Sequence, residues 1–438
     1  MNHFKALVDW LKQAVTDQEQ FHLGYADEAS EFVRFNHAQV RQAGQVQQAS
    51  LNLKLINDGR HADLGITLSG EAQLDRQRLA NGLQQLRETL PLLPPDPYLL
   101  LNPDAWHSHN EQLRPLPELA QVLDDISQAA DGVDLVGFYA AGPISRGFAS
   151  SSGAFGWHRA NSFNFDFSLF HANGEAVKAS YAGHTWNSAE FAARFQQARE
   201  QLAFLGRPLH TLAPGHYRAY LAPAALEEII SIITWGGFSA QAIASKGSSL
   251  QRLYAGDQSL SPLVTVDEQI SGSLSQAFST EGYPRKDVTL INAGKAEGQL
   301  VNSRSAAEYG LSTNGASSDE SPSALQMAAG SLAQADILKQ LGTGLYISNL
   351  WYLNYSDLPA ARLTGMTRFA TFWVENGEIK APVSTMRFDD SVYQLLGSQL
   401  EALTADRELL LSASTYDQRN TASNLLPGAL VNRLTLTL

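Results

Sequence analysis

The sequence has no cysteine in its 438 residues, and none of its 11 histidines comes after His216. The first absence excludes disulfide bonds and thiolate chemistry, and it is compatible with a reducing compartment. The second leaves the whole second half without an imidazole for metal binding or proton transfer. A metal centre or acid–base pair built on histidine is therefore restricted to the first half of the chain.

Basic residues are also few, because 31 Lys and Arg face 44 Asp and Glu, for a formal net charge of -13. Non-specific nucleic-acid binding needs cations that displace phosphate counterions, and anionic membranes attract the same cations, so neither partner is expected. Asp9 and Lys12 interrupt the amino-terminal apolar run, which excludes a secretory signal there, and no stretch approaches the roughly 18 apolar residues of a membrane span. We expect a cytoplasmic protein.

A chain of this length exceeds what one hydrophobic core usually supports, so we expect two domains, residues 1–212 and 213–438. The first alternates helical stripes with hairpin patterns, such as the alternating leucines that flank Asn57-Asp58-Gly59. The second is richer in short strands and turns, with one clear helix at Leu226–Trp235. The fold class is thus α+β: an amino-terminal domain of helices and antiparallel hairpins, then a mostly antiparallel β domain.

One strand of the first domain is especially clear. Phe163, Phe165, Phe167 and Leu169 alternate with polar residues, which predicts a half-buried strand whose other face carries Asn164, Asp166 and Ser168. By contrast, Gly142–Gly147 lacks the spacing of a nucleophile elbow or a phosphate loop and is expected to form a turn.

Two clusters have residue types that suit catalysis. His107, His109 and Glu111 alternate, so an extended backbone would put them on one face and let them share a metal ion, although a solvated polar loop is the favoured interpretation. Glu227 and Glu228 lie on the Leu226–Trp235 helix, where a metallopeptidase base would need two nearby histidines. Because none is present, we interpret this pair as the polar face of an amphipathic helix.

The stretch from Ile347 to Val383 is the most informative part of the chain. It reads as a buried strand (347–355), a loop with closely spaced charges and hydroxyls (362–368), and a hairpin (374–383). Polar groups inserted into such a segment need partners. They either hold the β domain together internally or contact an extended peptide or a neighbouring subunit, for which the candidates are Asn349, Tyr352, Arg362, Thr367 and Arg368. The polar run 312–322 is expected to be an exposed, mobile loop.

Several segments, in this order and spacing, resemble the TldD/PmbA family. The most specific are Thr364-Gly-Met-Thr-Arg368 and Glu375-Asn-Gly-Glu-Ile-Lys-Ala-Pro-Val383. Weaker matches occur at 30–36, 40–44, 285–294 and 304–310.

The resemblance implies a metallopeptidase complex. TldD-type subunits of the family carry a His-Glu-x-x-x-His helix and a late cysteine that bind zinc, whereas PmbA-type (TldE) subunits lack them and pair with the TldD type. The matching positions here are Leu226–Trp235 and Ser412–Gln418, and neither segment contains histidine or cysteine. The resemblance therefore implies a non-catalytic PmbA/TldE-like subunit, a pseudoenzyme with no cofactor of its own, whose TldD-type partner carries the zinc and whose complex hydrolyses unfolded peptides.

Two alternatives remain open. One is a stand-alone homodimeric protein that binds or scaffolds peptides and has lost the peptidase chemistry. The other is a metal enzyme built on His107, His109 and Glu111. The family is also described as modulators of DNA gyrase, which we interpret as a pathway link, because the acidic charge argues against DNA binding.

Overall fold

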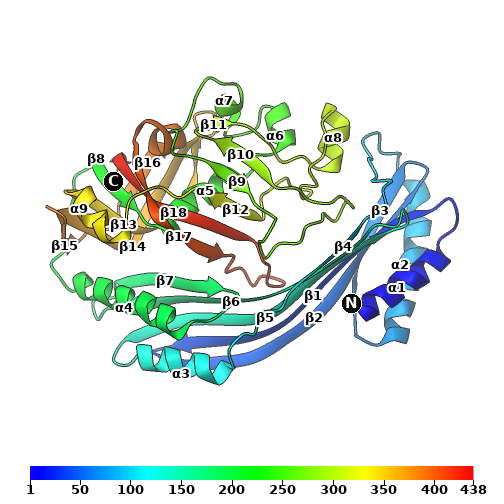
Figure 1. Cartoon of the computed structure of the whole chain (residues 1–438), viewed down its shortest axis with the longest axis horizontal. Helices are drawn as coiled ribbons and strands as arrows, with labels where there is room; N and C mark the ends of the chain where they lie inside the picture. Colours follow the sequence, from blue (N-terminus) through cyan, green and yellow to red (C-terminus); the bar gives the residue numbers. More distant parts are fainter. Residues whose placement is uncertain (438) are drawn as a thin grey trace.

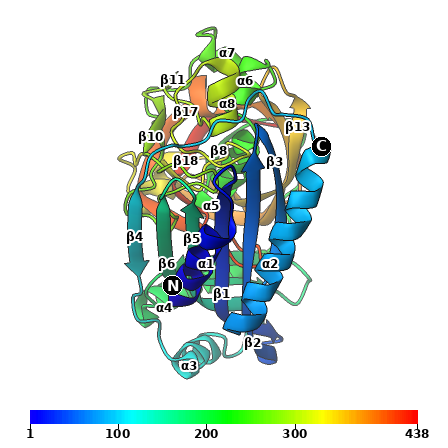
Figure 2. The ribbon, with the colours of Figure 1, turned by 90° about the vertical axis from the view of Figure 1, so that its right-hand side faces the viewer.

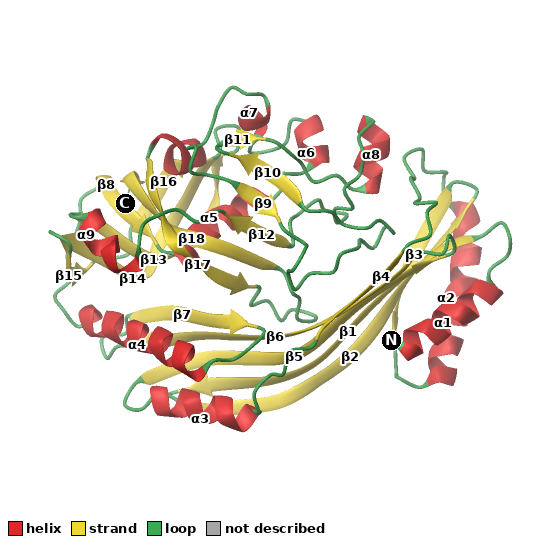
Figure 3. Ribbon diagram, viewed as in Figure 1, coloured by secondary structure: helices red, strands yellow, loops and turns green. Residues whose placement is uncertain are grey.

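The computed structural model describes residues 1–437 and contains two large β-sheets that face each other, with four helices outside the amino-terminal one (Figures 1 and 3). The amino-terminal sheet has seven strands in the order β3-β2-β1-β5-β6-β4, with β7 also paired to β6. Its strands are β1 (Gln20–Asn36), β2 (Gln39–Asn57), β3 (Arg60–Thr67), β4 (His107–Gln112), β5 (Asp134–Ser150), β6 (Phe155–Phe170) and β7 (Ala176–Gly183).

Alternation of side chains gives this sheet two different faces. The helices α1 (Asn2–Ala14), α2 (Ala72–Thr89), α3 (Leu119–Ala129) and α4 (Ser188–Leu205) pack on the face that carries Leu23, Trp157 and Phe165. Figure 2 shows α1 and α2 in front of the strands of this sheet. The opposite, concave face turns toward the carboxyl-terminal half, and Asn164 and Asp166 of β6 line a cavity there, as the alternation predicts.

The carboxyl-terminal sheet has 11 strands and is mixed, mostly antiparallel. Its order is β11-β10-β9-β12-β18-β16-β14-β13-β8, and an added pairing of β18 with β8 closes part of this path into a ring. Its strands are β8 (Gly215–Leu221), β9 (Val266–Glu268), β10 (Val288–Asn292), β11 (Lys295–Ala296), β12 (Ala324–Met327), β13 (Gly344–Asp357), β14 (Arg362–Glu375), β15 (Glu378–Pro382), β16 (Arg387–Ser391), β17 (Leu400–Leu411) and β18 (Ser423–Leu436).

Helices of this half pack on and around that sheet. They are α5 (Pro223–Thr234), α6 (Ala240–Ala244), α7 (Gln251–Tyr254), α8 (Ser303–Tyr309) and α9 (Ile337–Leu341), with short helical turns at Gln334–Asp336 and Gln394–Ser398. A further turn, Leu90–Leu92, follows α2 in the amino-terminal half. In residues 1–437 no helix is long and apolar enough to cross a membrane. The α+β fold class is confirmed.

The two halves share a hydrophobic core. One buried cluster joins Phe163 and Phe191 of the amino-terminal half to Phe372, Val374 and Leu430 of the other half. The chain passes from the amino-terminal sheet to the carboxyl-terminal sheet between β7 and β8. Because both sheets share one hydrophobic core, the division into domains 1–212 and 213–438 stays a prediction.

Several local predictions are wrong. Residues 362–368 are not a loop but the start of β14, whose backbone pairs with β13 and β16. Residues 347–355 are buried only at their beginning, since the strand bulges and leaves the sheet interior near Trp351. Gly142–Gly147 is not a turn but the interior of β5.

The run 312–322 is irregular, as expected, but it is not simply exposed. Glu320 is buried and accepts hydrogen bonds from the Ser239 hydroxyl and from the backbone amides of Gln241 and Asn302. A single carboxylate thus ties the run to two neighbouring segments.

Candidate functional site

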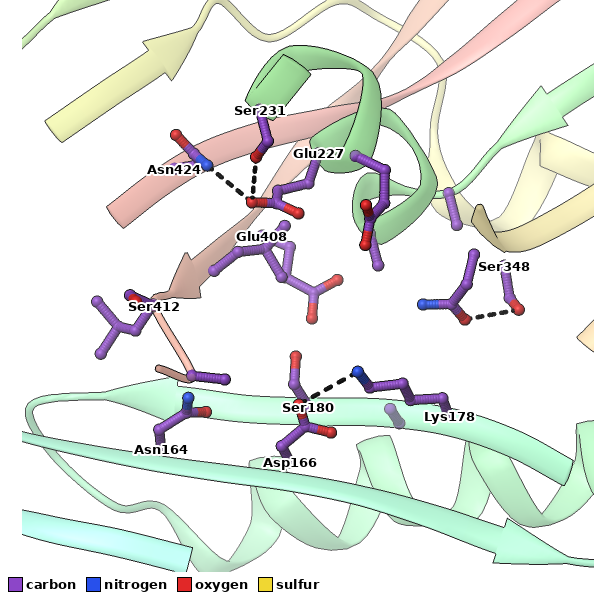
Figure 4. A pocket seen from close by; sticks show the side chains of 18 of the residues that line it. Asn164, Asp166, Lys178, Ser180, Glu227, Ser231, Ser348, Glu408, Ser412 and Asn424 are labelled. Atoms are coloured by element: carbon purple, nitrogen blue, oxygen red, sulfur yellow. Dashed lines mark hydrogen bonds and ion pairs between the residues drawn. The ribbon is translucent and has the colours of Figure 1, made fainter. Parts of the chain in front are cut away.

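A cavity of about 520 Å³ lies between the concave face of the amino-terminal sheet and helix α5 (Figure 4). β6 and β7 form its floor with Asn164, Asp166, Lys178 and Ser180. The remaining walls come from α4, α5, the start of β13, and the facing ends of β17 and β18. Both halves of the chain therefore build this site.

Helix α5 places carboxylates in that cavity because its two faces differ in polarity. Pro223 occupies its first turn, where a missing N–H costs nothing, and one face buries the side chains Ala225, Leu226, Ile229, Ile230, Ile232 and Ile233. Glu227 and Ser231 lie four residues apart on the other face, and both line the cavity. The predicted polar face of this amphipathic helix is thus a cavity wall.

Glu227 is held in place, whereas Glu228 is not. Glu227 Oε1 accepts a hydrogen bond from Ser231 Oγ at 2.8 Å and another from Asn424 Nδ2 at 3.0 Å. The Glu228 carboxylate forms no hydrogen bond or ion pair with any residue from 1 to 437. Burial, and then the negative charge of Glu227, raise the pKa of Glu228, and the charge of Lys178 opposes the shift.

The other carboxylates of the cavity have cationic partners. Lys178 Nζ lies 3.3 Å from Asp166 Oδ2 on the floor, and Arg194 Nη1 donates to Glu408 Oε1 at 2.7 Å. Burial nevertheless raises the pKa of Asp166 and of Glu408, and the nearby cation opposes the shift in each case. The cavity therefore combines two carboxylates that contact a cation with a pair on α5 that contacts none among the described residues.

The donor set of the cavity does not suit zinc. Zinc in proteins is held by imidazole, thiolate and carboxylate groups in a tight tetrahedron. The α5 wall offers carboxylates and a hydroxyl, and Ser412 and Ala413 border the cavity where a late cysteine is expected from the resemblance. Across the described part of the chain, no three His, Cys, Asp or Glu side chains are grouped closely enough to hold a metal ion.

A second hollow of about 490 Å³ adjoins this cavity and combines aromatic side chains with the cations Arg34, Lys178 and Arg419. Arg34, Phe35, Phe138 and Phe369 line it, and the Arg34 guanidinium lies 5.6 Å from the ring centre of Phe138. The two hollows share five lining residues, which are Asn164, Asp166, Lys178, Ser412 and Ala413. We call them the acidic cavity and the aromatic groove.

The segment Ser412–Gln418 separates the two hollows and is anchored by Arg419. The Arg419 side chain is 7% exposed and donates to Ser30 Oγ at 3.0 Å, to the Ser162 carbonyl oxygen at 2.9 Å and to Ser162 Oγ at 2.8 Å. Its backbone N–H donates to Glu28 at 2.7 Å. This short segment therefore has a fixed position on the amino-terminal sheet.

The structure distributes the five contact candidates over three environments. Asn349 lines the acidic cavity, and its Oδ1 accepts a hydrogen bond from the Ser348 hydroxyl. Thr367 is 1% exposed, and its Oγ1 accepts the Met386 N–H, while Arg362 pairs with Asp389.

The last two candidates form an exposed patch. Tyr352 is 78% exposed and adopts a φ of 57° at a bulge of β13. The Arg368 guanidinium lies 4.7 Å from the ring centre of Trp351 and 5.2 Å from that of Phe369. The Trp351 ring is in turn tilted against that of Tyr352, with the ring centres 5.5 Å apart. This patch, defined by Trp351, Tyr352 and Arg368, lies close to the aromatic groove through Phe369.

His107, His109 and Glu111 do share one exposed face, but of strand β4 rather than a loop. His109 Nε2 lies 3.4 Å from Glu111 Oε1, which also accepts a hydrogen bond from Trp157 Nε1. His107 instead stacks on Phe155, and the three do not meet as a metal-binding group among the described residues.

Sequence reasoning missed most of the acidic cavity. The alternation in β6 correctly identified the face of Asn164 and Asp166, but no sequence pattern pointed to Lys178, Arg194 or Glu408. These three residues come from separate elements. What they share is that each is a charged side chain on an otherwise half-buried strand or helix.

Comparisons with known proteins agree with this architecture. The family model for the PmbA/TldA metallopeptidase C-terminal domain matches residues 214–438. Metalloprotease PmbA of Escherichia coli O157:H7 is 32% identical over 132 residues, which is 30% of this chain. The match spans only 28% of that relative's length.

Solved structures match over the whole chain. TldE from Thermococcus kodakarensis has a TM-score of 0.79 at 14% identity, covering 100% of both chains. Two proposed modulators of DNA gyrase, from Bacteroides thetaiotaomicron and Thermotoga maritima, have TM-scores of 0.78 and 0.74 at 15% identity, and each covers 100% of this chain and 99% of the other. At such identities the likeness concerns the fold alone.

Proposed function

Because the chain belongs to the PmbA/TldD metallopeptidase family, we propose that it is a non-catalytic, TldE-like subunit of a cytosolic zinc metallopeptidase complex. A TldD-type partner would supply the zinc. This chain would complete the complex and hold unfolded peptides for the partner to cleave. We also propose that residues 1–212 and 213–438 form its two domains.

One observation carries the proposal. The two segments at which the family resemblance expects zinc ligands, helix α5 and Ser412–Gln418, border the same cavity, but they bring carboxylates and hydroxyls to it. A site that keeps its walls without metal-binding nitrogen or sulfur is suited to binding rather than to zinc catalysis. The fold similarity to TldE supports the same role.

The contact candidates fit this role in different ways. Asn349, in the cavity wall, is proposed to bond an extended peptide, whose main chain can pair as an added strand. The exposed Tyr352 and Arg368 are proposed to contact the partner subunit, since large aromatic and arginine side chains dominate such interfaces. Arg362 and Thr367 would hold the strands that present them.

The test is to co-express this chain with a TldD-type subunit from the same cell and to measure association, zinc content and cleavage of an unstructured peptide. We expect a stable complex with about one zinc per pair that is active only when both chains are present. Tyr352→Ala combined with Arg368→Ala should weaken the association, whereas Arg76→Ala, an exposed arginine on α2 at the other end of the molecule (Figure 1), should leave it unchanged.

Other outcomes point to the alternatives. A metal-free homodimer that has no effect on a TldD-type activity would replace the proposal with the stand-alone peptide-binding protein. Stoichiometric zinc and cleavage by this chain alone would overturn it and direct attention to His107, His109 and Glu111.

A further inference from the structure

The amino-terminal sheet has a long edge that no other strand within residues 1–437 covers. β2 pairs with β1 over residues 39–56, but β3 covers its other side only from Ser50 to Asn57. Residues 39–49 therefore form an open edge, and most of them are exposed. β2 lines neither the acidic cavity nor the aromatic groove, so this edge is separate from the candidate site.

The backbone of this edge presents hydrogen-bonding groups that have no partner. In an antiparallel strand the N–H and C=O of one residue point to the same side, and those of the next residue point to the other side. The carbonyl oxygen of Ala49 accepts the Leu68 N–H, so Ala49 points away from β1. The pairing of β2 with β1 has no register shift over residues 42–56, so every second residue before Ala49 points the same way. These residues are Ala43, Gln45 and Gln47, and no other strand of the described chain pairs with them on that side.

The composition of the open edge does nothing to prevent strand addition. Native proteins protect sheet edges with charged side chains, with prolines or with a covering segment. The neighbouring edge strand β3 has such protection, since it carries Arg60, His61 and Asp63. Residues 42–48 of β2, Gln-Ala-Gly-Gln-Val-Gln-Gln, contain no charged residue and no proline. The open edge is therefore suited to pairing with another strand.

A second copy of this chain supplies a strand that fits. Its edge is uncharged as well, so the two copies meet no like charge there although each has a net charge of -13. The open stretch is limited at one end by the turn at residues 37–38 and at the other by Leu68, which bonds Ala49. Two antiparallel copies, related by a two-fold axis, fit between these limits when the pairing is centred on Gly44.

The centre of that pairing is suited to close contact. Gly44 lies opposite Gly44 of the second copy, and the side chain that covers it comes from its partner on β1, Phe32. A Cβ added at Gly44 would lie 2.9 Å from Phe32 Cζ, so the ring occupies the space that a side chain would take. Ala43 and Gln45 then exchange main-chain hydrogen bonds with Gln45 and Ala43 of the second copy.

The ends of the pairing bring opposite charges together. At the turn between β1 and β2, Asp134 Oδ1 lies 3.0 Å from His37 Nδ1. At the end of β3, Arg78 Nη1 donates to the Thr67 carbonyl oxygen at 2.7 Å. In the pairing centred on Gly44 the turn of each copy lies next to the end of β3 of the other copy. Asp134 and Arg78 therefore attract each other across the contact.

We propose that two copies of this chain associate through the open edge of β2, in an antiparallel pairing centred on Gly44 that joins the two amino-terminal sheets into one. This inference goes beyond the proposed function, because it concerns a surface outside the candidate site and needs no TldD-type partner. A single strand edge buries less than the roughly 800 Å² per partner of a standard interface. The dimer is therefore weak, with a Kd of about 10–100 µM.

Analytical ultracentrifugation of the purified full-length chain from about 1 to 300 µM measures this association. Gln45→Pro removes an outward N–H that the chain itself does not use, so it should weaken the dimer about tenfold or more. Circular dichroism and urea unfolding of the dilute protein verify that this variant folds.

A second pair of variants tests the register without a proline. Gln47→Lys places a lysine close to Arg41 of the second copy and should weaken the dimer about tenfold, whereas Gln47→Glu should strengthen it. Gln85→Lys adds the same charge at an exposed position of α2 and is the matched control, which should dimerise as the wild type does.

Hydrogen exchange locates the contact. The amides of Ala43 and Gln45 should exchange more slowly at about 300 µM than at about 1 µM, because the second copy binds them. The amide of Gly44 points toward β1 in both states and should not change.

Three results would overturn the inference. The first is a chain that stays monomeric up to about 300 µM. The second is that the Gln45 and Gln47 variants dimerise as strongly as the wild type. The third is protection of the Ala43 and Gln45 amides only after a TldD-type subunit is added, which would assign the open edge to that partner.

Discussion

Replacing Arg419 with methionine tests whether one guanidinium anchors the segment between the two hollows. The substitution keeps the length and apolar stem of the side chain but removes its donors. Three hydrogen bonds of 3.0 Å or less are lost, one to Ser30 and two to Ser162. A hydrogen bond to a charged group is worth roughly 1.5 kcal/mol or more, so the three together contribute roughly 4–5 kcal/mol before desolvation is considered.

The surroundings of Arg419 set the net effect. Burial lowers the pKa of Arg419, and the charge of Glu28, itself buried, opposes that shift. Without the guanidinium, Glu28 loses a nearby cation and the Ser162 groups lose their donors, whereas the arginine desolvation cost disappears. We expect Arg419→Met to lower the free energy of unfolding by about 3–5 kcal/mol.

Urea unfolding of the wild type, Arg419→Met and the exposed control Arg41→Met measures this change in the free energy of unfolding. Hydrogen exchange then tests the local consequence, because amides 412–418 should exchange faster in Arg419→Met but not in Arg41→Met. A loss of stability below about 1 kcal/mol, within the range of an ordinary surface change, would refute the anchoring argument.

Three further changes test other parts of the structure. Burial lowers the pKa of His22 from 6.5 to about 4, so the folded state favours the neutral imidazole and loses stability as the pH falls from 6.5 to 4. His22→Leu should therefore remove about 2 kcal/mol of the stability change between pH 7 and 4.5. Identical pH profiles of unfolding for the variant and the wild type would contradict this. Gly142 has a φ of 141°, and an added Cβ would lie 2.1 Å from the Ala29 carbonyl oxygen. Gly142→Ala should therefore lower the free energy of unfolding by about 3 kcal/mol or more, measured by heat or urea. An unchanged unfolding midpoint would show that the added Cβ causes no steric strain. Thr367→Val leaves the buried Met386 N–H without its acceptor and should cost about 1–3 kcal/mol by the same measurement, so a neutral effect would show that the hydroxyl is dispensable.

The fold was predictable where side chains alternate or repeat regularly. The Phe163–Leu169 pattern predicted both the strand and its two faces, because a period of two residues admits only one arrangement. Strand β1 is 17 residues long, but it shows no such regular alternation over its whole length. Its earlier part includes Glu28, a buried carboxylate whose partner is the backbone of Arg419, 391 residues away.

Contacts between residues far apart in the sequence also explain why several local predictions were wrong. Gly142 reads as part of a turn, but it lies inside β5 where the pairing with β1 is interrupted opposite Ala29 and Ser30, and a glycine allows the close approach of Ala29. Glu320 lies in a polar run that reads as solvated, but its oxygens accept three hydrogen bonds from other segments. A carboxylate in a sequence does not reveal whether water or distant amides will surround it.

The candidate site was predictable only as separate parts. Glu227 and Glu228 were recognisable as the polar face of a helix, and Asp166 as the polar face of a strand. Their meeting across one cavity depends on how the two sheets face each other, which no local pattern encodes.

The position of β18 has a consequence for how the chain matures during synthesis. This strand, residues 423–436, pairs with β8, β12, β16 and β17, so it lies in the middle of its sheet although it is made after all the others. The amino-terminal sheet can assemble once residue 183 has left the ribosome. β8 can pair with β13 earlier, but its other edge must wait for β18, more than 200 residues later. During that interval the strands of the second half expose unpaired edges, which makes them candidates for chaperone protection until residue 436 emerges.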